Sequence, residues 1–299
     1  MKRGRHSILT KLGRIFQLIN PVLFSWTELL FKKNKIEKYP MIAIVSAPRS
    51  GSTLTTQILA RGTKSLYLTN LWNLLYAMPL IGGFLSKNKT AKNDFQSNLG
   101  WVDGIYGESE GMRFWEYWIG QSLEEPIKKV PDLRINYIQK VFGRLLKNNN
   151  PMILSYLGHA FSVQELRKIF PGIIFIYLKR DKMANLNSLV NVNKDREWFS
   201  LKPIGWEKKK KLDSYKKSLW QYNQISSSLD NAYDKEDTLI VWYEDICNSP
   251  HEFLKKVQKF AYKNKIKLEL DTSKVPAKFK SREIKRGDYM NNEKLLENE

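Results

Sequence analysis

The sequence predicts an α/β protein, a three-layer sandwich in which helices cover both faces of a central parallel sheet. Short apolar runs recur along the chain without the polar alternation of a half-exposed sheet, and long helical patterns separate them. One run continues through a turn-forming segment, residues 46–53, directly into a helical pattern. Ligands of such folds bind at the carboxyl ends of the strands, where this segment lies.

Four strands are expected, at residues 41–45, 152–156, 173–178 and 238–243. Each is short and almost wholly apolar, as strands buried between two helical layers are. A further apolar stretch, residues 71–85, contains Pro79, Gly82 and Gly83 and is too short to cross a bilayer. We expect it in the core or in the lining of a pocket.

The segment after the first strand is expected to bind an anion. A helix is predicted to begin just after Gly51, and the first turn of a helix offers unpaired N–H groups and the positive end of its dipole. Ser50, Ser52 and Thr53 add hydroxyl groups, and Gly51 adds backbone without bulk. The simplest ligand for this loop is a phosphate.

The chain is expected to form one domain, because 299 residues can bury one large core and no repeat or linker divides them. We expect a basic amphipathic segment at residues 1–37, a domain at residues 38–290 and a loose tail at residues 291–299. The first segment fits neither a bilayer span nor a cleavable signal. It is predicted to be a helix on a membrane surface, a helix packed on the domain, or a frayed terminus.

The chain carries 50 Lys and Arg against 30 Asp and Glu, a formal charge of +20. This excess favours anionic partners such as nucleotides, phospholipid surfaces, nucleic acids or acidic sugars, unless it reflects a compositional bias. A nucleic-acid-binding protein would rest on charge alone, because no recognised module is present. We therefore expect no nucleic-acid partner.

Cys247 is the one cysteine, so intrachain disulfides and cysteine-based metal clusters are excluded. A reducing compartment is the simplest assumption, and a cytoplasmic location is expected. No two of the three histidines have the spacing of metal ligands, so no metal is expected.

The anion loop departs from two common nucleotide motifs. In a nucleoside triphosphatase P-loop, Ser46 would stand where the first glycine belongs and Ser52 where the lysine belongs. The dinucleotide pattern G-x-G-x-x-G is absent. ATPase, kinase and nicotinamide-dependent activities therefore have little support.

Residues 48–54 read P-R-S-G-S-T-L and resemble the phosphosulfate-binding loop, P-R-S-G-[ST]-T-L, of the sulfotransferases that use 3′-phosphoadenosine 5′-phosphosulfate. This P-loop-like segment identifies the chain as similar to that family. The resemblance implies that the donor is bound by Arg49, Ser50, Gly51, Ser52, Thr53 and Leu54.

Two later segments carry the same resemblance. Residues 165–190 are similar to the family's strand and helix that bind the 3′-phosphate, with Arg180 at the strand end and Ser188 eight residues later. Lys182 stands where the family has proline. Residues 220–261 resemble the family's W-x-x-Y-N helix and Y-E-D-L strand end, in which we expect Tyr243 to be structural.

A general base is expected in residues 106–118. This segment resembles a bacterial branch of the family with E-F-G-Y-F-W, which aligns its glutamate with Glu110. Glu110 is therefore the first choice as base, and Glu108 and Glu116 are the alternatives. Without the resemblance, these acids would be expected to cap or ion-pair an exposed helix.

The pattern breaks at residues 150–171. His159 keeps the family's spacing to Pro171, but the lysine that helps to stabilise the transferred group falls on Ser155. His159 is predicted either to touch donor or acceptor or to be a core histidine. Near the carboxyl terminus, residues 279–289 resemble the loop that closes over the 3′-phosphate with altered spacing, and only Arg286 and Gly287 carry over.

The resemblance implies transfer of a sulfuryl group from 3′-phosphoadenosine 5′-phosphosulfate to an acceptor hydroxyl by in-line displacement, with Glu110 as base and no metal. Aromatic residues between positions 71 and 118 favour a sugar or lipid-linked hydroxyl, and a small-molecule acceptor stays open. Ser155 motivates the alternative, a weakened family member that binds an adenosine nucleotide or acidic glycan without transfer.

Overall fold

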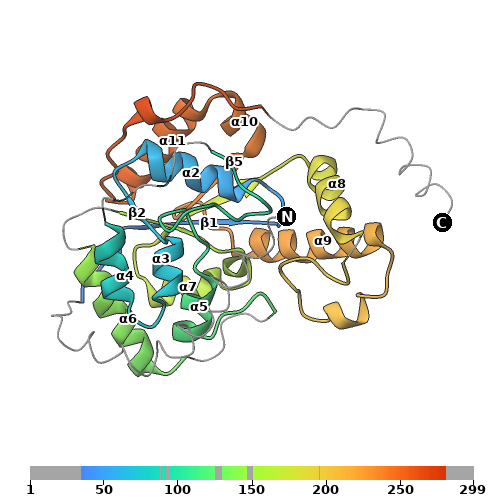
Figure 1. Cartoon of the computed structure of the whole chain (residues 1–299), viewed down its shortest axis with the longest axis horizontal. Coiled ribbons are helices and arrows are strands. Elements are labelled where there is room, and N and C mark those ends of the chain that lie inside the picture. Colours follow the sequence, from blue (N-terminus) through green and yellow to red (C-terminus); the bar gives the residue numbers. More distant parts are fainter. Residues whose placement is uncertain are drawn as a thin grey trace, which may run out of the picture.

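The structure is a computed structural model that describes residues 35–87, 89, 91, 95–124, 130–146, 151–194 and 196–280. Most of the predicted amino-terminal segment, the tail at residues 291–299, and Arg286 and Gly287 therefore lie outside the described residues. The described part has the expected α/β architecture, with one sheet between two layers of helices (Figure 1).

The sheet contains five parallel strands in the order β2-β3-β1-β4-β5. Their bounds are β1 (Met41–Ser46), β2 (Leu66–Tyr67), β3 (Met152–Ser155), β4 (Ile174–Lys179) and β5 (Thr238–Trp242). The four predicted strands are confirmed, each within two residues at either end, whereas β2 was not predicted. Since β1 lies at the centre, its carboxyl end is flanked by those of β3 and β4.

Both faces of the central strands are buried, which explains why their sequences do not alternate. Ala43, Val45 and Phe175 contribute to a core on one face, whereas Ile42 and Ile176 contribute to a core on the other. Helices α3 (Asn70–Leu74), α4 (Pro79–Ser86), α5 (Met112–Ile119), α6 (Asp132–Leu145), α7 (Val163–Ile169) and α9 (Ser214–Ala232) supply the first core. Helices α2 (Ser52–Gly62), α10 (Tyr243–Asn248) and α11 (Pro250–Lys263) supply the second, seen at the top of Figure 1.

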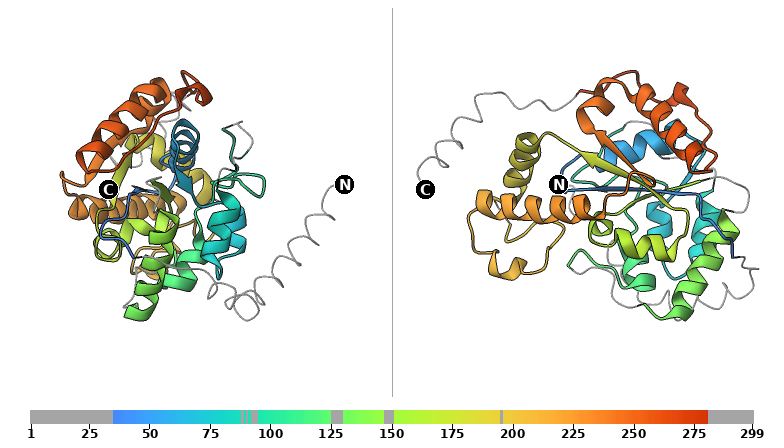
Figure 2. Two further views of the ribbon diagram at one scale, coloured as in Figure 1. Left: turned by 90° about the vertical axis from the view of Figure 1, so that its left-hand side faces the viewer. Right: turned by 180° about the vertical axis from the view of Figure 1, so that it is seen from behind.

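Helix α8 (Lys182–Asn193) starts directly after β4 and packs beside α9. The front view (Figure 1) and the back view (right panel of Figure 2) show that these two helices project together to one side of the sheet. Asp181 accepts a hydrogen bond from the Ala184 N–H, 2.7 Å away, and so caps the start of α8. The cap forms although Lys182 replaces the family's proline.

The apolar stretch at residues 71–85 forms most of α3 and α4, and Trp72 and Leu80 within it are completely buried. It is therefore part of the core, as predicted, while Phe84 and Leu85 at its end are exposed. No helix among the described residues has the length and apolar character that a membrane crossing requires.

Candidate functional site

The anion loop joins β1 to α2 through two residues with left-handed backbone, Arg49 at φ 67° and Gly51 at φ 94°. A Cβ atom on Gly51 would lie 2.2 Å from the Cδ2 atom of Tyr243, so only glycine fits against that ring. No side chain caps the start of α2 within the described part of the chain, which leaves N–H groups of its first turn for a ligand.

Arg180, which lies between β4 and α8, and residues of α8 hold the loop from the other side. Arg180 Nη1 donates to the Arg49 carbonyl at 2.8 Å, and Arg49 Nε donates to the Ser188 hydroxyl at 3.1 Å. Asn185 Nδ2 lies 2.9 Å from Ser50 Oγ and 3.1 Å from the Pro48 carbonyl. The loop and α8, about 130 residues apart in sequence, therefore form one hydrogen-bonded unit.

A cavity of about 560 Å³ lies over this unit. Its lining includes eight of the residues predicted from the sequence: Arg49, Gly51, Ser52, Thr53, Leu54, Glu110, Arg180 and Ser188. Ser50 is not among them, because its side chain is buried and bonded to Asn185. The lining also includes residues that were not predicted as site residues: Phe95, Gln96, Ser97, Asn98, Leu99, Gly100, Leu157, Phe199, Tyr243, Phe279 and Lys280. Of these, Tyr243 was expected to be structural.

Glu110 faces the anion loop across Gly100. A Cβ atom built on Gly100 would lie 3.7 Å from Glu110 Oε1 and 3.7 Å from Thr53 Oγ1, so the two oxygens lie within twice that distance of each other. The Glu110 carbonyl accepts a hydrogen bond from Trp115 Nε1 at 3.1 Å, which fixes the backbone at this point.

Protein atoms pack around the Glu110 carboxyl group, although part of its surface stays open to the cavity. Burial raises the pKa of Glu110 to about 7, and a hydrogen bond from the Leu157 N–H opposes the shift. A carboxylate with this pKa can accept a proton near neutral pH, as a general base must.

Glu108, the first alternative as base, has a different environment. Its Oε1 lies 3.2 Å from Arg61 Nη2, and both side chains are almost completely buried. A small cavity of about 10 Å³ is lined by both Glu108 and Glu110, together with Thr53 and Ser155. The buried ion pair with Arg61 distinguishes Glu108 from Glu110. Glu116, the second alternative, is exposed on α5 and does not line the large cavity.

His159 lies in the core and does not line the large cavity. Its ring centroid is 4.6 Å from that of Trp115 and 5.4 Å from that of Tyr156, and its Nδ1 is 3.0 Å from Gln121 Oε1. Burial lowers the pKa of His159 to about 3, so the ring is neutral at physiological pH. This environment corresponds to the core-histidine alternative.

Ser155 ends β3 beside Ile44 of β1, close to the anion loop. The family's lysine is therefore replaced at the carboxyl end of a central strand. Of the residues that the structure describes, three cationic ones line the large cavity instead: Arg49, Arg180 and Lys280. Lys280 lies in residues 279–289, the segment that resembles the loop over the 3′-phosphate, but only Arg286 and Gly287 of that segment were predicted as site residues.

The profile described as the sulfotransferase family matches residues 40–262, and the chain belongs to this family. Among solved structures, sulfotransferase STF9 from Mycobacterium avium is 16% identical with a TM-score of 0.50, over 76% of this chain and 64% of that one. Sulfotransferase STF1 from Mycobacterium tuberculosis H37Rv is 13% identical with a TM-score of 0.46, over 84% of this chain and 73% of that one. The chain thus spans less than two thirds of the Mycobacterium avium protein, and that likeness concerns the fold. No curated protein matches the chain.

Proposed function

We propose that the protein transfers a sulfuryl group from 3′-phosphoadenosine 5′-phosphosulfate to an acceptor hydroxyl. The observation that carries this proposal is that Glu110 lines the same cavity as Arg49, Ser52 and Thr53 of the anion loop segment. An acceptor hydroxyl group held in this cavity beside Glu110 would have a base on one side and the anion loop on the other. In-line displacement needs this arrangement.

The large cavity suits the donor in size and charge. Its volume of about 560 Å³ is typical of small-molecule sites, and three cationic residues line it. We assign the 5′-phosphosulfate to the first turn of α2 and the 3′-phosphate to Arg180 and Ser188, because a guanidinium group can grip phosphate with two parallel hydrogen bonds. Ser50 then supports the loop through Asn185.

In the proposed step, the acceptor oxygen attacks sulfur while the bond between sulfur and the 5′-phosphate oxygen breaks. Glu110 takes the proton of the hydroxyl group, and adenosine 3′,5′-bisphosphate leaves. Arg49 and the N–H groups of the loop stabilise the charge that develops on the sulfuryl group and the leaving phosphate.

The acceptor is proposed to be an uncharged hydroxyl compound with an apolar or ring face, such as a sugar or a lipid-linked hydroxyl. A second cavity of about 440 Å³ shares Gln96, Ser97 and Asn98 with the large cavity. Trp101 in its lining is 60% exposed, and an exposed indole can stack on a sugar or an apolar ring. Among the residues that the structure describes, no cationic one lines this cavity, which disfavours an acidic glycan.

Ser155 supports a second candidate function, nucleotide binding without transfer. The cavity beside Ser155 measures only about 10 Å³, and no cationic side chain lines it within the described ranges of the chain. If Arg49 and Lys280 do not replace the missing lysine, the protein would bind the donor and leave it intact.

Calorimetry with adenosine 3′,5′-bisphosphate, combined with a transfer assay, separates the two candidates. We expect the bisphosphate to bind, and radiolabelled donor to label an acceptor from a panel of neutral sugars and lipids. Glu110→Gln should keep bisphosphate binding and lower transfer by about 10²-fold or more, because it removes the base. Glu116→Gln, which changes an exposed glutamate on α5, is the matched control and should keep both.

Absence of bisphosphate binding by the folded protein would overturn both candidates. Binding without transfer to any acceptor would favour the second. Equal losses of transfer in the two glutamine variants would remove Glu110 from its role as base.

A further inference from the structure

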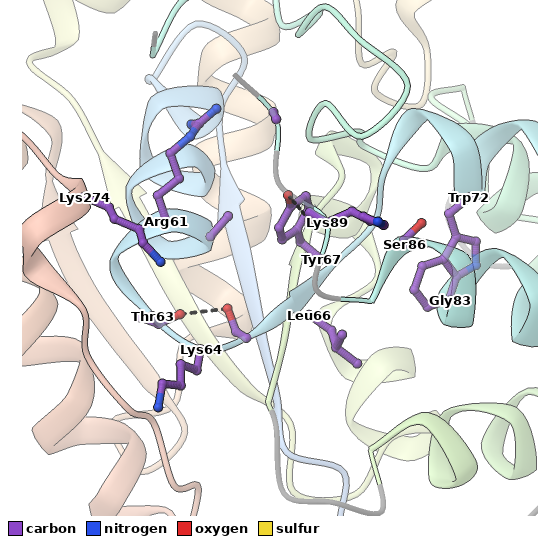
Figure 3. Close-up of a pocket in the computed structure, with 13 residues that line it drawn as sticks. Arg61, Thr63, Lys64, Leu66, Tyr67, Trp72, Gly83, Ser86, Lys89 and Lys274 are labelled. Carbon is purple, nitrogen blue, oxygen red and sulfur yellow. Dashed lines mark hydrogen bonds between the residues drawn. The ribbon is translucent and has the colours of Figure 1, made fainter. Parts of the chain in front are cut away.

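We propose that the groove between α2 and α4 is a second ligand site, which takes an organic anion with an apolar body. This cavity of about 320 Å³ is bounded by the end of α2, by β2 and by α4 (Figure 3). The anion loop is at the other end of α2, so roughly 15 Å of helix separates the groove from the donor site. The proposal goes beyond sulfuryl transfer and does not depend on it.

The charge of the lining points to an anion. Among the thirteen described residues that line it, four are cationic, Arg61, Lys64, Lys89 and Lys274, and none is acidic. Figure 3 shows Lys64 and Lys274 on the α2 side of the groove and Lys89 pointing toward Ser86 on the α4 side. An anion in the groove is therefore flanked by ammonium groups from both walls.

The acids around the groove do not neutralise all of this charge. Arg61 pairs with Glu108 and Lys274 pairs with Asp271. Glu269 is shared between Lys64 and Lys267, 2.9 Å and 3.0 Å away, so this cluster keeps one excess positive charge.

Lys89 has no ion-pair partner in the part of the chain that the structure describes. It is therefore the cation most readily used by a ligand.

The rest of the lining suits an apolar body. Leu66, Ala60 and the half-buried Ala91 supply apolar surface, while Trp72 in the same lining is completely buried. The Tyr67 hydroxyl donates to the Lys89 carbonyl at 3.1 Å, which holds the residue that carries the key ammonium group against β2. Burial, followed by the Glu108 charge, raises the pKa of Tyr67 to about 12, so this phenol is neutral and adds no opposing charge.

The ligand class that fits is a phosphate, sulfate or carboxylate group on a ring or short alkyl body. Lys89 and the Lys64 cluster would bind the anionic group, and Leu66 and Ala91 would contact the body. An inorganic anion lacks the apolar part, whereas a neutral ring lacks the charge. The inorganic anion and the neutral ring should each bind more weakly than a compound that has a charge and an apolar part.

The test is calorimetry on the full chain with phenyl phosphate, phenyl sulfate and benzoate, with phenol and inorganic phosphate as partial probes. We expect at least one aromatic anion to bind more tightly than both partial probes, and the tightest identifies the anionic group. Lys89→Ala should weaken that binding by about tenfold or more, the scale of one charge-assisted hydrogen bond. Lys255→Ala, which removes an exposed lysine of α11 outside the groove, should not.

A competition experiment distinguishes this site from the donor site. Saturating adenosine 3′,5′-bisphosphate should leave the aromatic anion bound, and Lys89→Ala should leave bisphosphate affinity unchanged. Displacement by the bisphosphate, equal losses in the two lysine variants, or no binding of any aromatic anion would each overturn the proposal. None of these results alters the bisphosphate measurement on which the proposed function depends.

Discussion

Among single residues, Glu110 is the proposed general base, and its burial sets the pKa at which it would act. Its carboxyl group has a pKa of about 7 because protein atoms exclude water around it. A base must be ionised, so transfer is expected to rise as the pH increases through about 7 and then to level off. A rate profile measured with saturating donor tests this, and a rise centred near the ordinary glutamate pKa of about 4.3 would contradict it.

The same pKa makes a prediction about stability. The folded pKa lies above the unfolded value of 4.5, so the unfolded chain releases this proton first as the pH rises. Glu110 should therefore lower the free energy of unfolding between about pH 4.5 and 7, and by a constant amount above pH 7. Urea denaturation of Glu110→Gln should show higher stability than the wild type at about pH 8, and a smaller difference at about pH 4. A pH-independent difference would contradict this assignment.

Gly51 has a backbone conformation and a neighbour that both require glycine. Gly51→Ala places a methyl group against the Tyr243 ring and should lower the free energy of unfolding by about 1–3 kcal/mol and abolish bisphosphate binding. Gly205→Ala is the matched control, because Gly205 has φ 88° and no atom within 4 Å of the added Cβ. Gly205→Ala should lower the free energy of unfolding only through backbone strain, and it should leave bisphosphate binding intact. Similar binding losses in both variants would show that the Tyr243 contact is unimportant.

At the scale of elements, the site depends on how α8 holds the anion loop. Asn185 is completely buried and donates from α8 to the loop, although it does not line the cavity. Asn185→Ala should lower the free energy of unfolding by about 1–3 kcal/mol and also weaken bisphosphate binding, because the loop loses its support. Denaturation and calorimetry measure the two effects.

Helix α8 offers a matched control for this change. Asn193 ends the same helix, is 1% exposed, and donates to Ser218 of α9 at 3.0 Å instead of to the loop. Asn193→Ala should cost similar stability and leave bisphosphate affinity unchanged. If both variants bind the bisphosphate equally well, Asn185 does not position the loop.

The sequence predicted those elements whose signal is local. The strands at β1, β3, β4 and β5 are continuous apolar runs, and the start of α2 follows a recognisable loop. β2 was missed because two residues are too few to show a periodic pattern. The segment from Phe95 to Gly100 has no periodicity, so its place over the cavity follows only from tertiary packing.

Among the site residues, the local motif predicted which side chains gather at the loop but not what each one contacts. Ser50 belongs to the motif, yet its hydroxyl is bonded to Asn185, a partner 135 residues away. His159 kept its family spacing, yet its surroundings are set by Trp115 and Gln121 from another segment. Contacts between segments so far apart in the chain cannot be predicted from the local sequence pattern.

For the whole molecule, the formal charge of +20 is expected to act on the rate of ligand encounter. A positive field attracts a bisphosphate from beyond contact distance, and salt screens this attraction over a Debye length of about 8 Å at physiological ionic strength. The association rate constant of adenosine 3′,5′-bisphosphate should therefore fall with added salt more steeply than the dissociation rate constant rises. Stopped-flow measurements over a range of salt concentrations test this.

Reversing charges away from both cavities separates the effect of the protein's overall charge on association from the effect of direct contacts in the site. Lys256 and Lys259 are exposed on α11 and line neither the large cavity nor the groove between α2 and α4. The double variant Lys256→Glu and Lys259→Glu should slow association and leave dissociation unchanged, whereas Arg180→Ala should mainly speed dissociation because it removes a direct contact. A contradicting result would be a change in the dissociation rate constant of the α11 variant as large as that of Arg180→Ala. The charge excess would then not act by accelerating association, and binding would depend on α11 in a way that the cavity does not explain.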